Sequence, residues 1–200
     1  SAAKLALDDA RLRVGQTNAD RIGVTMGVCN GTAETAHMDS VFASDTYTGQ
    51  VGSFSNIVPN STAGWVSVSL QLRGVNCTLA AGPHAGLQSL AYAYEALAEE
   101  RALAVVAAAS DEVYPQTYYN YDAIGFLYQG AEEAEYRIRP DEGKRKVLGE
   151  GAGALVLEAA APALERGAPI LAEILGQGMT MDTGGFLAPN LAPDGLARAM

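Results

Sequence analysis

The residues with the clearest potential for chemistry lie at a predicted turn between a strand and a helix. Residues 79–88 read LAAGPHAGLQ, with the break at 81–83. A helix that starts directly after a strand exposes its first residues, and its unpaired N–H groups carry a partial positive charge. Such positions suit thiol and hydroxyl nucleophiles. This turn contains no Cys, Ser, Thr, Asp or Lys, so the sequence predicts the shape of a catalytic turn without an ordinary nucleophile.

Other side chains offer weaker candidates. His84 could act as a base but fits a polar residue of the first helical turn equally simply. Cys29 follows a predicted strand and is the better candidate for a reactive thiol, whereas Cys77 falls inside a strand, where an inert buried thiol is expected. The cysteines form no Cys-x-x-Cys pair, and the glycine-rich 149–153 lacks the Lys-Ser/Thr of a phosphate loop. We therefore predict no metal site and no cofactor.

Three apolar, strand-prone segments and one helix position the turn. The strands are expected at 21–29, 75–80 and 103–109, and the helix at 84–101. Strand, helix and strand in this order form a βαβ unit, for which parallel strands are the default. The predicted core face of the helix consists of Leu87, Leu90, Ala91, Tyr94 and Leu97.

The remaining segments are assigned from their hydrophobic periodicity and from the Gly and Pro residues that end helices and strands. The tyrosine-rich residues 114–135 indicate a loop with short helical pieces that could form a lid, a pocket wall or an interface. The other expected elements are helices at 1–12, 160–166 and from 193 onward, a glycine-rich turn that runs into a strand within 147–157, and a strand at 170–178. The segment 65–72 fits either a strand or an amphipathic helix, of which we predict the helix.

Composition excludes several classes of partner. The 200 residues are 48% hydrophobic and 18% charged, which is typical of a folded globular chain. Thirteen Lys and Arg against 23 Asp and Glu give a net charge of −10, which argues against nucleic acid. The longest apolar run, 102–109, is far shorter than the ~20 residues of a membrane span, and no secretory leader is visible. We expect a cytoplasmic protein that binds neither nucleic acid nor membrane.

Taken in order, five segments resemble the beta-ketoacyl-acyl-carrier-protein synthases, which are condensing enzymes of the thiolase fold. The resemblance implies an α/β protein with the layered αβαβα architecture of that fold. The segments are 20–24 (DRIGV), 61–65 (STAGW), 72–86 (LRGVNCTLAAGPHAG), 147–158 (VLGEGAGALVLE) and 166–182 (RGAPILAEILGQGMTMD).

The departures from the family pattern concern function. Counted from Arg73-Gly74, the position of the family's catalytic cysteine falls on Pro83, which has no nucleophilic atom, and Trp65 replaces a customary histidine. The loop at 139–146 is shorter than usual. The family's two catalytic histidines and its lysine lie in the second half of the fold. Residues 1–200 are thus expected to represent mainly the N-terminal half, without its first strand.

One subgroup of this family lacks the cysteine: the chain-length factors, whose turn often reads QAGGLD where this chain has PHAGLQ at 83–88. The resemblance implies a non-catalytic subunit that forms a heterodimer with an active ketosynthase in type II polyketide, aryl-polyene or fatty acid biosynthesis. An acyl carrier protein would deliver the acyl or malonyl chains.

The resemblance to chain-length factors also implies roles for particular residues. The strand at 75–80 would pair with its counterpart across a pseudo-twofold axis, with Val75, Cys77 and Leu79 at the interface. Asn30, Tyr119 and Phe126 would line the acyl tunnel shared by the two subunits.

Two alternatives remain open at this point. The chain could be a catalytic beta-ketoacyl synthase, or a decarboxylating acyltransferase of the same family, that works without the usual cysteine or uses Cys29. It could also be a structural relative with an assembly role alone, in which case changing Asn30 or Tyr119 would leave product length unaltered.

Overall fold

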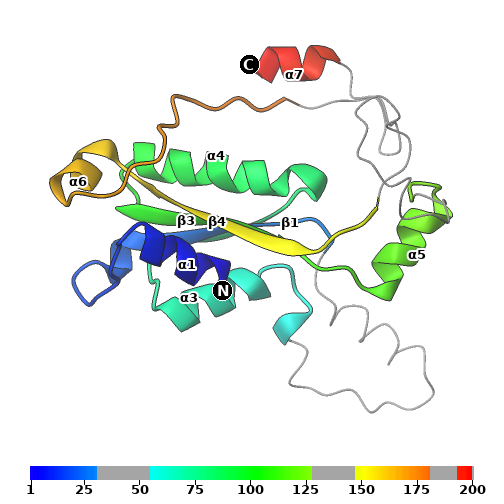
Figure 1. Ribbon diagram of the computed structural model, residues 1–200, viewed down its shortest axis with the longest axis horizontal. Coiled ribbons are helices and arrows are strands. Elements are labelled where there is room, and N and C mark those ends of the chain that lie inside the picture. The colour runs from blue at the N-terminus through cyan, green and yellow to red at the C-terminus, as the bar shows by residue number, and fades with distance from the viewer. Residues whose placement is uncertain (31–54, 128–146, 181–192, 200) are drawn as a thin grey trace.

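The computed structural model describes residues 1–30, 55–127, 147–180 and 193–199. In these residues a four-stranded sheet lies between two layers of helices (Figure 1). The strands are β1 (Ile22–Val28), β2 (Asn76–Ala80), β3 (Ala104–Asp111) and β4 (Gly151–Glu158), and they lie in the order β2-β1-β3-β4.

The three strands predicted around the turn are present and parallel. β1 pairs in parallel with both β2 and β3, whereas β4 runs antiparallel to β3. Every residue of β1 is buried, as expected for a central strand made of β-prone apolar residues. The crossover from β2 to β3 spans β1, which fills the position between them. The prediction of a parallel βαβ unit is therefore confirmed.

The two helical layers cover opposite faces of the sheet. α1 (Ala2–Asp9) and α3 (Ser61–Leu70) lie on one face and α4 (Ala85–Ala98) lies on the other (Figure 1). The first core contains β1 side chains such as Val24 and Met26 together with Leu7 of α1. The second contains Val105 of β3 against alanines of α4. The segment 65–72, whose pattern fits either a strand or a helix and for which we predict a helix, is helical as far as Leu70, where α3 ends.

α4 contacts the sheet through small residues. A Cβ atom on Gly27 would lie 2.4 Å from the carbonyl of Ala85, so the helix begins directly against the backbone of β1. This close approach selects the face formed by Ala85, Ser89, Ala93 and Ala96 for burial. Leu90 and Leu97 pack against the edge of the core, but Leu87 is 69% exposed, so its predicted place in the core is wrong.

The remaining elements largely follow the sequence-based expectation. They are the short helices η1 (Ala19–Arg21), η3 (Gly82–His84), α5 (Pro115–Ala123), α6 (Ala160–Glu165) and α7 (Pro193–Ala199). The strand expected at 170–178 is absent: this stretch has no regular structure, and Leu171 is 91% exposed. No strand in the described residues pairs with it, and an extended segment becomes a strand only beside one. None of the described helices is long and apolar enough to cross a membrane.

Candidate functional site

The candidate site lies where the parallel strands end. β1 ends at Val28 and is followed by Cys29 and Asn30, β3 ends at Asp111, and β2 leads through Ala81 into η3. Because the three strands are parallel, their carboxyl ends lie at the same end of the sheet, the end beside α5 in Figure 1. Ligand sites of open α/β sheets characteristically lie just outside the carboxyl ends of the strands.

The turn before α4 has the predicted strand–turn–helix form. Gly82 adopts a φ of +65°, a conformation that favours glycine, and Pro83 stands exposed in the first helical turn, where proline is well tolerated. Proline has no backbone N–H as well as no reactive side chain. Position 83 can therefore supply neither a nucleophile nor an oxyanion-binding donor. His84 beside it is exposed.

Asp111 holds the end of β1. The N–H of Cys29 donates to both carboxylate oxygens of Asp111 at 3.1 Å, and the N–H of Asn30 donates to Oδ1 at 2.9 Å. Hydrogen bonds to an ionised carboxylate are roughly twice as strong as neutral ones. Sequence analysis missed Asp111, although a carboxylate at the end of a buried strand was a usable signal.

Two tyrosines of the α5 region also contact Asn30. The hydroxyl of Tyr114 donates to the backbone carbonyl of Asn30 at 2.8 Å, and that of Tyr121 donates to its Oδ1 at 3.1 Å. The ring of Tyr121 packs on Phe126 with centroids 5.1 Å apart. Asn30 and Phe126 are thus connected through Tyr121, a residue that the sequence analysis did not single out. Tyr119 is 68% exposed and packs edge-to-face against Tyr118.

The thiol of Cys29 is poorly placed to act as a nucleophile. Its burial and the negative charge of Asp111 raise the pKa of Cys29, and the hydrogen bond with Tyr121 offsets this rise only in part. The reactive species is the thiolate, whose fraction falls as the pKa rises. Burial, followed by the proximity of Cys29, also raises the pKa of Tyr121, so its hydroxyl stays protonated and acts as a donor.

The second predicted surface is the outer edge of β2. Among the described residues this strand pairs with β1 alone. Cys77 lies opposite Thr25, whose hydroxyl contacts Ser89 of α4, so Cys77 and Leu79 face the α4 side of the sheet; both are half-buried. Val75, also half-buried, lies one residue before the strand begins. An unpaired strand edge is a ready template for pairing with another chain.

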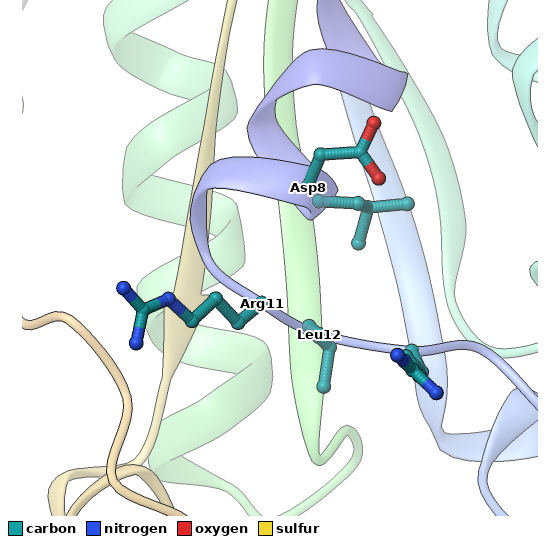
Figure 2. A pocket seen from close by; sticks show the side chains of 5 residues that line it. Asp8, Arg11 and Leu12 are labelled. Carbon is teal, nitrogen blue, oxygen red and sulfur yellow. The ribbon is translucent and has the colours of Figure 1, made fainter.

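A separate hollow of about 340 Å³ lies at the end of α1 (Figure 2). It is lined by Leu7, Asp8, Arg11, Leu12 and Arg13. Figure 2 shows the side chains of Asp8 and Arg11 extending in different directions. Asp8 pairs with Lys4 on the same helix. The hollow lies near the amino end of β3, because Arg166 joins the carbonyl of Arg11 to Glu158, the residue opposite Ala104. It is therefore remote from the candidate site.

Comparison with known proteins identifies the relatives of this chain. Residues 1–163 match the family model described as "Beta-ketoacyl synthase, N-terminal domain". The chain is 32% identical over 207 aligned residues to 3-oxoacyl-[acyl-carrier-protein] synthase 2 of Staphylococcus aureus, covering 100% of the chain and 50% of that relative. The chain thus spans about half the length of the curated relatives it matches.

Solved structures agree with the sequence comparison. The crystal structure of a beta-ketoacyl synthase from Burkholderia phymatum superposes with a TM-score of 0.84 at 30% identity, covering 92% of this chain and 46% of that one. A type II polyketide acyl-carrier protein in complex with its ketosynthase matches with a TM-score of 0.73 at 24% identity, over 90% and 51% of the two chains. The predicted thiolase-like α/β fold is confirmed, and the chain belongs to the beta-ketoacyl synthase family, with its N-terminal domain in residues 1–163.

Proposed function

We propose that this chain is a non-catalytic, chain-length-factor-type subunit that pairs with an active beta-ketoacyl synthase and shapes its acyl tunnel. The observation that carries the proposal is the exposed Pro83 in η3, the short helix that leads directly into α4. In this family the reacting acyl group is carried by a cysteine at that position, and proline removes both the thiol and the backbone donor. A partner subunit would have to carry the reaction.

The surroundings of the other thiol near the site support this reading. The alternative in which Cys29 replaces the missing nucleophile requires a thiolate, and both burial and Asp111 oppose its formation. Nucleophilic cysteines are normally activated by nearby positive charge or by a helix N-terminus. A carboxylate that accepts hydrogen bonds from the backbone of Cys29 is the opposite environment.

The open edge of β2 supports pairing with a second chain. We propose that Val75, Cys77 and Leu79 lie at this heterodimer interface, because their strand ends the sheet within the described residues. We propose that Asn30, Phe126 and Tyr119 line the acyl tunnel. Tyr121 contacts both Asn30 and Phe126 beyond the carboxyl ends of the strands. The exposed ring of Tyr119 lies on α5, the same helix as Tyr121. An acyl carrier protein is the proposed source of the chains.

Native mass spectrometry with a thiol reagent directed at ketosynthases tests the proposal. The full-length protein is purified from its own host and measured before and after treatment. A one-to-one complex in which a second, ketosynthase-sized chain alone takes up the label is the expected result. A homodimer labelled on this chain would instead make it a catalytic synthase like the relatives it matches, and the proposal would fall.

A further inference from the structure

Two arginines that follow α1 differ from the other cationic side chains that the structure describes. Arg11 and Arg13 are exposed, and neither guanidinium has an ion-pair or hydrogen-bond partner among the described residues. Every other described Lys or Arg has one: Lys4 pairs with Asp8, Arg73 with Asp20, Arg101 with Glu99 and Arg166 with Glu158, Arg21 donates to the carbonyl of Glu100, and Arg198 has a partner as well. In a chain with 23 Asp and Glu against 13 Lys and Arg, an arginine without a partner is the exception.

Both of these arginines line the hollow of about 340 Å³ at the end of α1. Figure 2 shows Arg11 and Leu12 side by side on the turn that follows the helix. Leu7, which is buried, and Leu12, which is half-buried, supply the apolar surface of the hollow. Sites for small ligands have volumes of roughly 300–1,000 Å³, so the hollow has the size of a small one.

The negative groups around the hollow are already paired with other donors. The carboxylate of Asp8 also lines the hollow, but it forms an ion pair with Lys4. The carbonyls at the end of α1 carry the negative end of the helix dipole. Those of Ala10 and Arg11 accept hydrogen bonds from Arg166. The hollow therefore combines unpaired positive charge with apolar surface.

We propose that this hollow binds a small amphipathic oxyanion, that is, a molecule with a carboxylate or phosphate head and an apolar body. Arg11 and Arg13 donate charge-assisted hydrogen bonds to the head, for which the planar guanidinium is well suited. The apolar body covers Leu7 and Leu12 and removes their surface from water. The hollow lies at the amino end of the parallel strands, away from the candidate site, so this inference does not depend on the proposed function.

Chemical protection of the arginines tests the proposal on the full-length protein. Phenylglyoxal modifies accessible guanidinium groups, and mass spectrometry of the peptides gives the rate at each arginine with and without octanoate or octyl phosphate. At about ten times its Kd, a bound probe should slow the modification of Arg11 and Arg13 roughly tenfold. The rate at Arg73 should not change, and octanol, which lacks the oxyanion, should protect neither residue. The more effective probe identifies the head as carboxylate or phosphate.

A pair of charge-matched variants measures the contribution of one guanidinium. In titration calorimetry Arg13→Gln should bind the more effective probe about tenfold more weakly, because one charge-assisted hydrogen bond is lost. Arg73→Gln removes the same charge at the same end of the sheet and should bind the probe as the wild type does. Modification of Arg11 and Arg13 at unchanged rates with both probes would overturn the proposal. Equal affinity of the two variants would also overturn it, because the probe would then be bound elsewhere, for example in the proposed acyl tunnel.

Discussion

Asp111 acts on its two neighbours in different ways. It fixes the backbone at the end of β1 through three hydrogen bonds, and it places a negative charge beside the thiol of Cys29. The first effect stabilises the position of Asn30. The second effect raises the pKa of Cys29. The carboxylate that fixes the backbone of the site therefore also lowers the fraction of reactive thiolate at Cys29.

The reactivity of Cys29 should therefore depend strongly on pH. A pKa raised above the ordinary thiol value means that little thiolate exists at neutral pH, so alkylation should be slow there and accelerate about tenfold per pH unit until the pH passes the pKa. Mass spectrometry of the Cys29 peptide after timed treatment with iodoacetamide gives the rate at each pH.

Asp111→Asn provides the control for this titration. Removal of the charge takes away one of the two causes of the raised pKa, so alkylation of Cys29 should be faster than in the wild type at the same pH below the plateau. A rate that has already reached its plateau at neutral pH in the wild type would contradict the assignment and would reopen Cys29 as a nucleophile.

At the scale of elements, the direction of the main-chain groups in β2 decides what its open edge can bind. The carbonyl of Val75 accepts from the N–H of Val24 at 2.7 Å. Main-chain groups alternate along a strand, so those of Cys77 also face β1 and those of Asn76 and Thr78 face the open edge. The edge thus offers a short row of donors and acceptors to a second strand.

Thr78→Pro tests strand pairing at this edge. Proline removes an outward N–H without removing a bond to β1, and proline is tolerated in strands only on such edges. We expect the proposed complex with a ketosynthase to dissociate at least about tenfold more readily, because an intermolecular hydrogen bond is lost and the ring obstructs close pairing. Native mass spectrometry across a dilution series measures the change.

Thr78→Val is the matched variant, because it keeps the N–H and the branched shape. It should leave the complex intact, and the Thr78 hydroxyl that it removes is buried without a partner among the described residues. Circular dichroism establishes that both variants remain folded. Equal affinity of the proline and valine variants would show that β2 does not pair with the partner.

Local patterns predicted the elements more reliably than their contacts. The run at 103–109 predicts a buried strand because it is short, apolar and bounded by charge, and β3 begins one residue later, at Ala104, and continues to Asp111. The buried face of α4 was not foreseen, since it depends on the close approach of the helix to Gly27. The link from Tyr121 to Asn30 spans 91 residues, and no local pattern contains it.

In the candidate site, too, features encoded by consecutive residues could be predicted, whereas contacts between distant elements could not. Pro83 could be placed because the turn is encoded by consecutive residues, whereas the partners of Asn30 are supplied by the ends of different elements. The prediction of a strand at 170–178 is wrong for a related reason: apolar residues alone do not make a strand, because strand formation requires a neighbouring strand, and no described strand pairs with this segment.

At the scale of the whole molecule, the side chain of Arg166 connects the end of α1 with the end of β4. Arg166, after α6, pairs with Glu158 at the end of β4 at 2.5 Å and donates to the backbone carbonyl of Ala10, 156 residues away, at 2.9 Å. The Glu158 side chain is 9% exposed and that of Arg166 is 26% exposed. A guanidinium can serve a carboxylate and a helix C-terminus together, which an ammonium group cannot match.

Arg166→Lys should therefore destabilise the protein although the charge is kept. We expect the free energy of unfolding to fall by about 1–3 kcal/mol, because the lost hydrogen bonds leave the buried Glu158 carboxylate and the carbonyls at the end of α1 incompletely paired. Arg101→Lys is the matched control: Arg101 pairs with Glu99 at the surface, where ion pairs contribute little, so its unfolding midpoint should not move. Urea unfolding of the full-length protein compares the two variants.

Equal unfolding midpoints for Arg166→Lys and Arg101→Lys would contradict this prediction. They would mean that α1 is held to the sheet by its apolar face alone, through Ala3 and Leu7, and that the Arg166 contacts add nothing to the stability of the fold.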